Sequence, residues 1–325
     1  MIIARTPLRI SIGGGGSDLP SYYERFGGAF ISAAIDKYIY VAINNTFINE
    51  YSIRYSSQER VTRPDEIRHP IIREAIKLHG LGPLELVSVA DIPTRTGLGS
   101  SGSFTVCVLR AIHAHKRELM TTSSLAEEAY HIEMKLLKEP VGKQDHYIAA
   151  YGGITYFEID KAGQVAVSPL KLTNKGLHDL EDHLVLFFTG YARGASTVLA
   201  EQKAKCDSGD EEMIKNLHFI VELGQEIRKA LMASDNRRFA QLMHEHWLHK
   251  RQRSSSMSSD RINRWYDAAM ANGAIGGKLV GAGGGGFLLF YAEDIAGVRD
   301  AMSKEGLEEV RFKFDFDGST ILVRD

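Results

Sequence analysis

The sequence predicts an α+β protein in two lobes, with the division near residues 170–182. Three observations lead to this fold class. Apolar residues follow a strand-like spacing over roughly the first 60 residues; a buried strand, a glycine-rich loop and a helix then follow in order; and the second half is rich in helical segments before it closes with strands. We therefore expect an amino-terminal domain over 1–175 and a carboxy-terminal domain over 176–325.

The elements of the first half follow from apolar spacing and from turn residues. The runs at 38–43 and 51–55 are typical of strands, and a proline in the first turn with Gly80 as a stop predicts a helix over 70–78. The other expected elements are a short helix at 19–26, a buried strand at 84–90, helices at 101–115, 123–137 and 144–151, and strands at 154–159 and 165–170.

The second half is mainly helical until its last quarter. A strand is expected at 184–189, and the serine run at 254–259 predicts a loop between helices. The expected helices lie at about 195–205, 211–232, 236–252 and 260–271, and the closing strands lie around 278–281, 286–291, 309–314 and 320–323.

Composition and charge exclude several classes of function. The 325 residues are 44% hydrophobic and 25% charged, which is close to the average for globular proteins. A net charge of -2 gives no basic field for nucleic acid, and the longest apolar runs, 184–188 and 287–291, fall far short of the roughly 20 residues that span a bilayer. Cys107 and Cys206 cannot make a disulfide framework. We expect a cytoplasmic protein without nucleic-acid or membrane partners.

Glycine is the residue type that stands out, because many of the 31 glycines fall in three clusters. The central cluster, PTRTGLGSSGS at 93–103, precedes an apolar helix. Small residues let the backbone approach a ligand, and a helix amino terminus presents free N–H groups and a positive dipole end, so phosphate is the expected ligand. A glycine-rich turn with serine N-caps is the alternative. The expected phosphate-binding residues are Thr96, Gly97, Leu98, Gly99, Ser100, Ser101, Gly102 and Ser103.

Known phosphate loops match this segment incompletely. The pattern Gly97-x-Gly99-x-x-Gly102 has the dinucleotide fingerprint, but a second helix follows where a parallel strand is needed. A Walker A loop requires lysine where Ser103 stands, and the HRD segment of protein kinases is absent from the sequence.

The other two clusters are PLRISIGGGGSD at 7–18 and GAGGGG at 281–286. Each alone could be a permissive turn, but three together are harder to explain in this way. In this order they resemble the GHMP small-molecule kinases over nearly the whole chain. With GKQDHYIAAYGG and GGKLVGAGGGGFLLFY, they are most similar to the D-glycero-α-D-manno-heptose 7-phosphate 1-kinases and the related fucokinases.

The resemblance implies ATP-dependent phosphorylation of the anomeric hydroxyl of a sugar, here D-glycero-D-manno-heptose 7-phosphate, to give the 1,7-bisphosphate. It also implies an amino-terminal domain similar to ribosomal protein S5 domain 2, a ferredoxin-like carboxy-terminal domain, and an active site between them. ATP, Mg²⁺ and a sugar phosphate are the implied ligands of a monomer or homodimer. A fucokinase acting on an unphosphorylated sugar and a catalytically silent sugar sensor are the alternatives.

By the same resemblance, Asp145 matches the catalytic aspartate, and Glu133 with Ser101 matches the metal site. Lys143 is expected to hold the substrate or the transferring phosphoryl group, and Arg9 is the basic residue of the first motif. A solvated helix carboxylate for Glu133 and a first-turn acid for Asp145 are the structural alternatives.

Sugar recognition needs polar groups for hydroxyls and basic groups for a phosphate. Asp18 matches the aspartate that binds sugar hydroxyls, and Arg193 lies where related kinases keep a substrate arginine. Lys278 is expected at the distal phosphate, with an exposed lysine as the alternative. The other expected substrate-binding residues are Gly15, Gly16, Ser17, Gly283 and Gly284.

The histidine-rich segment at 244–249 suggests a zinc site but misses the HExxH spacing by one residue. We therefore do not expect a metal there. The serine run that follows it stands beside Lys250, Arg251 and Arg253, and this nearness leaves a role in gating the substrate open.

Overall fold

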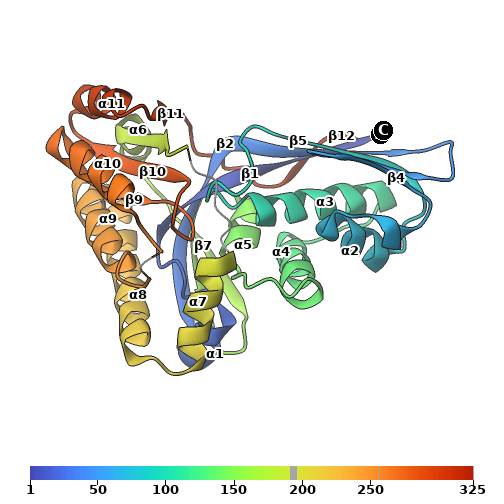
Figure 1. Cartoon of the computed structure of the whole chain (residues 1–325), viewed down its shortest axis with the longest axis horizontal. Coiled ribbons are helices and arrows are strands. Elements are labelled where there is room, and N and C mark those ends of the chain that lie inside the picture. The colour runs from blue at the N-terminus through green and yellow to red at the C-terminus, as the bar shows by residue number, and fades with distance from the viewer. Residues whose placement is uncertain (191–195, 255, 325) are drawn as a thin grey trace.

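The computed structural model of the chain describes residues 1–190, 196–254 and 256–324, and Figure 1 shows two groups of elements side by side. Strands β1 (Ile2–Gly13) and β2 (Gly28–Asn45) form the long antiparallel ribbon at the centre of the larger sheet. Within the described residues this sheet has eight strands in the order β12-β1-β2-β5-β3-β4, with β6 and β7 added through β2. The remaining strands are β3 (Tyr51–Arg54), β4 (Gln58–Val61), β5 (Leu84–Ala90), β6 (Ile154–Ile159), β7 (Val165–Pro169) and β12 (Thr320–Arg324).

The length of β2 explains the shape of this sheet. One edge of β2 pairs with β1 along most of its length, while the other edge pairs with β6 through residues 28–33 and with β5 through residues 39–45. The register of β1 against β2 shifts after Pro7 and again after Ser11. Such irregularities bend a strand, and the segment that carries Arg9 lies between the two.

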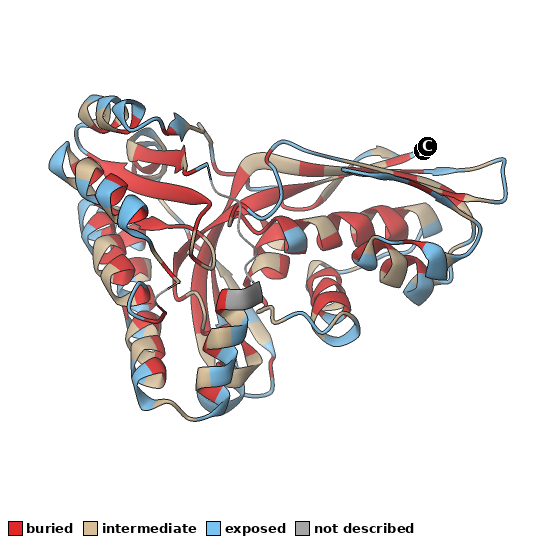
Figure 2. Ribbon diagram, in the orientation of Figure 1, coloured by how far each residue is buried: buried red, intermediate tan, exposed pale blue. Residues whose placement is uncertain are grey.

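Helices cover one face of the larger sheet (Figure 1). Helix α3 (Ser100–Lys116) packs against β1 and β2, and Figure 2 shows that most of this helix is buried. Helix α4 (Thr122–His131) continues into a wide π turn, Ile132–Leu136, so the single helix expected over 123–137 changes its winding after His131. The other helices of this half are α1 (Pro20–Phe26), α2 (Pro70–His79) and α5 (Gln144–Tyr151).

The smaller sheet, four antiparallel strands in the described part of the chain, has the order β11-β8-β10-β9. Its strands are β8 (Leu184–Phe188), β9 (Ala274–Leu279), β10 (Phe287–Ala292) and β11 (Glu308–Glu309). The helices of this half are α6 (Asn174–His183), α7 (Ser196–Asp207), α8 (Glu211–Met232), α9 (Asn236–Lys250), α10 (Asp260–Ala271) and α11 (Ile295–Lys304). The expected α+β class is confirmed.

The end of the chain returns to the larger sheet, because β12 pairs antiparallel with the first residues of β1. The expected domain limits of 1–175 and 176–325 stay a prediction. In the ranges that the structure describes, no helix is both long and apolar enough to cross a bilayer.

Some helices and strands differ from expectation: β4 was not predicted as a separate strand, and the strand expected around 278–281 lies at Ala274–Leu279. Helices α6 and α11 were not predicted, although each begins with a side-chain cap: Thr173 accepts from the Gly176 N–H, and Asp294 accepts from the Gly297 N–H. The strand expected at 309–314 is wrong, because only Glu308–Glu309 pairs with β8 and the chain then turns to the larger sheet, where Phe314 bridges Ile35.

Candidate active site

A cavity of about 910 Å³ is lined by parts of all three glycine clusters. Gly15 and Gly16 come from the first cluster, Gly97 and Gly99 from the central cluster, and Gly283 from the third. Because residues so far apart in the sequence line one cavity between the two sheets' helices and loops, the expected convergence of the clusters is seen in the structure.

The central cluster turns from the end of β5 into α3, and its glycines are required by geometry. Gly97 and Gly99 have φ of +87° and +75°, and a Cβ on Gly97 would lie 2.6 Å from the Val280 carbonyl oxygen. Helix α3 begins at Ser100, so the free N–H groups of its first turn lie at the cavity. This wall of the cavity has the features of an anion site.

The residues of this loop have two orientations. Gly97, Gly99, Ser100, Ser101 and Gly102 line the cavity. The side chains of the other predicted residues are turned into the protein: the Thr96 hydroxyl donates to Pro93 O (3.0 Å), the Ser103 hydroxyl donates to Pro7 O (2.8 Å), and Leu98 is fully buried.

Glu133 lies in the π turn and is 2% exposed. Its Oε2 accepts from the Ser101 hydroxyl (2.7 Å), and its Oε1 accepts from the Thr105 hydroxyl (2.6 Å) and lies 3.0 Å from His146 Nε2. Burial alone would raise the pKa of Glu133, but the charge of His146 and the three hydrogen bonds outweigh burial and lower that pKa. Burial lowers the pKa of His146, and the Glu133 carboxylate more than reverses this and raises it. The two side chains therefore form a buried ion pair.

The pair of oxygens from Ser101 and Glu133 fits a magnesium ion. Mg²⁺ prefers oxygen ligands at about 2.1 Å in octahedral geometry, which places neighbouring ligands about 3 Å apart. The Ser101 hydroxyl and Glu133 Oε2 are 2.7 Å apart, and both residues line the cavity beside the amino terminus of α3.

Asp145 lies in the first turn of α5, and its carboxylate is held by Arg9 of β1. The Arg9 Nε donates to Asp145 Oδ1 (2.8 Å), a second guanidinium nitrogen lies 2.7 Å from the same oxygen, and the third donates to Gly97 O (2.5 Å). Arg9 is 5% exposed, whereas the Asp145 side chain is 32% exposed in the cavity. A Cβ on Gly102 would lie 2.7 Å from Asp145 Cβ, so the central loop packs directly against this acid. The arrangement fixes one carboxylate where it can accept a proton.

Lys143, expected beside Asp145, faces elsewhere. It is buried, and its ammonium group bonds Glu127 and donates to Gly163 O (2.7 Å). It also lies 5.0 Å from the Tyr130 ring centroid, and it is not among the cavity-lining residues. The structure therefore does not bring Lys143 together with the other predicted site residues.

The residues expected to bind the substrate divide in a similar way. Asp18 lines the cavity, its carboxylate accepts from the backbone N–H groups of Gly16 (3.0 Å) and Gln144 (3.1 Å), and burial raises its pKa. Lys278 also lines the cavity. Ser17 is buried and donates to Gly14 O and Ala29 O, and the Gly284 N–H donates to Met257 O. Arg193 lies outside the described residues.

Several residues that line the cavity were missed. His246 and Lys250 of α9 and Arg253 just after it lie on the wall formed by the carboxy-terminal half. The basic stretch beside the serine run was the signal that could have found them. At another part of the cavity, Tyr55, His69 and Phe104 present neighbouring rings, with centroids 4.7 Å apart for Tyr55 and His69 and 4.9 Å apart for His69 and Phe104. Such flat apolar surfaces suit a planar base.

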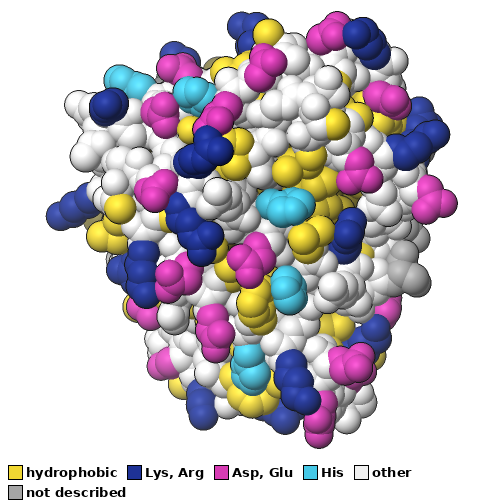
Figure 3. Space-filling view, turned by 90° about the vertical axis from the view of Figure 1, so that its left-hand side faces the viewer, with side chains coloured by type: hydrophobic (Ala, Val, Ile, Leu, Met, Phe, Trp, Pro, Cys, Tyr) yellow, Lys and Arg dark blue, Asp and Glu magenta, His cyan; other side chains and the backbone are white. Residues whose placement is uncertain are grey.

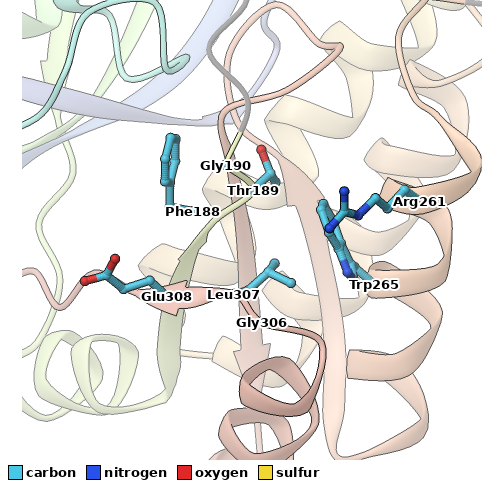
Figure 4. A pocket seen from close by; sticks show the side chains of 8 residues that line it. All are labelled: Phe188, Thr189, Gly190, Arg261, Trp265, Gly306, Leu307 and Glu308. Carbon is cyan, nitrogen blue, oxygen red and sulfur yellow. The ribbon is translucent and has the colours of Figure 1, made fainter.

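A second, smaller cavity of about 390 Å³ lies where β8, α10 and the turn before β11 meet (Figure 4). Its lining includes Thr189, Arg261 and Glu308, and it contains none of the residues that the motifs predicted. The larger cavity is therefore the candidate active site.

Comparison with known proteins agrees with this geometry. The model of the GHMP kinases N terminal domain matches residues 69–153, and the model of the GHMP kinases C terminal matches residues 227–308. The chain is 31% identical over 306 residues to the D-glycero-alpha-D-manno-heptose 7-phosphate kinase of Campylobacter jejuni, covering 90% of this chain and 89% of that protein. It is 24% identical to the bifunctional fucokinase/GDP-fucose pyrophosphorylase of Arabidopsis thaliana, covering 93% of this chain and 31% of that protein.

A solved D-glycero-D-manno-heptose 1-phosphate kinase from Bacteroides thetaiotaomicron superposes with a TM-score of 0.82 at 26% identity, covering 99% of both chains. The galactokinase of Lactococcus lactis shares the fold at 16% identity, with a TM-score of 0.78 and 98% and 94% of the two chains covered. The matches to both halves and the extent of the Campylobacter relative show that this chain belongs to the GHMP kinases and is a sugar kinase, a phosphotransferase with an alcohol group as acceptor.

Proposed function

We propose that this kinase transfers the terminal phosphoryl group of ATP to the anomeric hydroxyl of D-glycero-D-manno-heptose 7-phosphate, giving the 1,7-bisphosphate. The similarity to the Campylobacter heptose 7-phosphate kinase supports this acceptor. The observation that carries the chemistry is the fixed position of Asp145, which Arg9 holds beside the central glycine cluster at Gly97.

In this proposal the backbone N–H groups at the start of α3 bind the phosphates of ATP, and the rings of Tyr55 and Phe104 contact the base. Mg²⁺, held by Ser101 and Glu133, would neutralise phosphate charge. Asp145 accepts or orients the proton of the attacking hydroxyl.

Two buried side chains position the reacting groups. Arg9 fixes the carboxylate of Asp145 with one hydrogen bond and an ion-pair contact from a second guanidinium nitrogen, and keeps a positive charge at the point of transfer. Asp18 accepts two backbone hydrogen bonds, which orient its carboxylate toward the cavity for sugar hydroxyls.

A fucokinase-like activity on an unphosphorylated sugar is the second candidate, because of the similarity to the Arabidopsis fucokinase. A panel of acceptors with ATP and Mg²⁺ separates the two: D-glycero-D-manno-heptose 7-phosphate, the unphosphorylated heptose, L-fucose and D-mannose. We expect turnover of heptose 7-phosphate. Turnover of fucose without turnover of heptose 7-phosphate would overturn the acceptor assignment.

The variant Asp145→Asn tests the chemistry. Loss of a general base typically costs about 10²- to 10⁴-fold in kcat, and we expect this loss with the KM for ATP changed less than about threefold. Asp207→Asn is the matched control, since Asp207 pairs with Lys203 on the exposed part of α7 and should leave kcat unchanged. Unchanged turnover in Asp145→Asn would remove Asp145 from the proposed role.

A further inference from the structure

One wall of the active-site cavity holds three buried basic side chains, of which the motifs predicted only Lys278 as a phosphate ligand. We define the cation cluster as Lys250, Arg253 and Lys278, whose exposed fractions are 7%, 5% and 1%. All three line the cavity, and they come from α9, the segment after it and β9. Burying a charge is costly unless it is paired, so this arrangement requires a physical reason.

The partners of the cation cluster do not neutralise it. Lys278 donates to Ile12 O (3.4 Å), and Lys250 donates to Leu279 O (3.3 Å) and to Gly281 O. The Arg253 guanidinium donates to Asn216 Oδ1 (2.8 Å) and Gly15 O (3.1 Å). These acceptors are neutral, and among the described residues no carboxylate accepts from the three side chains.

Polar nitrogen atoms next to the cation cluster also lack partners, and in a neutral His246 ring one of the two nitrogens is a donor. Arg253 Nη2 is buried without a hydrogen-bond partner in the described part of the chain, and so are both ring nitrogens of His246, which is 1% exposed. His246 lines the same cavity. Unsatisfied donors that converge on a cavity are a signature of a missing acceptor with several oxygens.

The lowered pKa values of these basic side chains also indicate that their charges are not balanced. Burial and the charges of Arg253 and Arg9 lower the pKa of Lys250 to about 7, and burial lowers the pKa of Arg253 to about 10. Burial and the three neighbouring cations bring the pKa of Lys278 well below its usual value, and burial also lowers that of His246. Asp18 is the acid that partly offsets this for Arg253. By contrast, Figure 3 shows cations and anions interspersed over an outer face of the molecule.

The cation cluster extends from the turn that carries Asp18 to the third glycine cluster. Arg253 bonds Gly15 O, and a Cβ on Gly16 would lie 2.8 Å from Arg253 Nη1, so the guanidinium contacts the turn that also carries Asp18. At the other end of the cation cluster, Lys250 donates to Gly281 O, and a Cβ on Gly281 would lie 2.6 Å from Gly97 Cα, so this end is close to the central glycine cluster. Arg253 is therefore the member of the cluster that lies next to the expected site of the acceptor sugar, and it is the residue to test.

We propose that Lys250, Arg253 and Lys278, with His246, bind a phosphate group of the acceptor, so that the enzyme selects sugars already phosphorylated away from the reacting hydroxyl. The inference rests on the proposed function. A phosphate offers enough oxygens for several converging donors, whereas a sugar hydroxyl offers one.

The test compares Arg253→Gln with wild type on D-glycero-D-manno-heptose 7-phosphate and on the unphosphorylated heptose. A hydrogen bond between charged groups contributes about 1.5–3 kcal/mol, so the variant should raise the KM for the phosphorylated acceptor about 10- to 100-fold. The KM for ATP and kcat/KM for the unphosphorylated heptose should change less than about threefold. Arg253→Lys should restore part of the affinity, and Lys203→Met, on the exposed side of α7, should have no effect.

Other results would overturn the inference. A raised KM for ATP with no change for the acceptor would assign the cation cluster to nucleotide phosphates, and an equal loss for both sugars would make it structural. If wild type phosphorylates only neutral sugars, the inference fails while the kinase activity stands. Calorimetric titration of heptose 7-phosphate without ATP separates the two claims: binding that Arg253→Gln abolishes, without any turnover, supports the inference and refutes the proposed function.

Discussion

The buried ion pair of Glu133 and His146 predicts a specific effect of Glu133→Gln on stability. Glutamine keeps one acceptor oxygen for Thr105 and His146 but removes the negative charge that compensates the buried imidazolium. Because both partners are almost completely buried, solvent screens the pair little. The variant should therefore be less stable than wild type, and its loss should depend on pH.

The magnitude follows from the burial of the two groups. Removing one partner of a buried pair costs about 3–5 kcal/mol, and the retained hydrogen bonds reduce this to about 2–4 kcal/mol at pH 6. The lowered pKa of Glu133 contributes stability above pH 4.5 that is lost as the pH falls through its folded-state value. The raised pKa of His146 contributes stability below pH 6.5 that is lost as the pH rises through its folded-state value. The difference between wild type and variant should be largest between pH 4.5 and 6.5.

Urea unfolding followed by circular dichroism at pH 6, 7.5 and 9 measures this difference as a change in the free energy of unfolding. Glu226→Gln is the control, since Glu226 pairs with Lys229 on the surface of α8 and should change stability by less than about 0.5 kcal/mol. A loss of less than about 0.5 kcal/mol for Glu133→Gln at pH 6, or a loss that stays constant to pH 9, would refute the reasoning.

Three further predictions concern the cavity and its supports. Gly102→Ala places a methyl group against Asp145 and should lower kcat about tenfold or more, because small displacements of a catalytic group are costly. Steady-state kinetics at saturating ATP measure this loss, and an unchanged kcat would contradict the prediction. Lys143→Met removes the buried contact with Glu127 and should lower the free energy of unfolding by about 2–3 kcal/mol, while the KM values change less than about threefold. A loss of turnover without a loss of stability would instead support a catalytic role for Lys143. The pKa of Lys250 is about 7 without ligand, and the negative charge of an acceptor phosphate should raise that pKa. Binding above pH 7 should therefore take up a proton, and the affinity should weaken toward pH 9. Calorimetry in buffers of different ionisation enthalpy measures the proton uptake, and an affinity independent of pH would argue against the prediction.

The turn of the central glycine cluster could be predicted from the sequence because its determinants are local. Positive φ at Gly97 and Gly99 and the start of a helix at Ser100 are properties of consecutive residues, and glycine and serine report them directly. The convergence of the three clusters depends on pairing between distant strands, and it was inferred from the resemblance of the motifs rather than from spacing.

The orientation of Lys143 shows what motif membership leaves out. Lys143 immediately precedes α5, and Asp145 lies two residues later in its first turn. Successive residues of a helix differ by about 100°, so two residues apart means nearly opposite directions. When Asp145 faces the cavity, Lys143 must face Glu127 and Gly163. This exclusion was available from the sequence, since it follows from helix geometry.

The residues of the cation cluster could not be identified in the same way. Lys250 and Arg253 stand in a basic stretch at the end of a helix, where a solvated face and a buried site have the same composition. Only the packing of α9 against β9 decides between them, because it turns this helix end toward the cavity. Helices α6 and α11 were missed for a different reason: each has only ten residues, and a single capping residue, Thr173 or Asp294, marks its start.

Strand β1 and the turn that follows it connect the reacting centre to the cation cluster. Arg9 contacts Asp145, the Ile12 carbonyl accepts from Lys278, and the Gly15 carbonyl accepts from Arg253. If the cation cluster binds the acceptor phosphate as proposed, a neutral sugar would leave these basic side chains without an anionic partner, and the distal charge of the acceptor would be part of the fit.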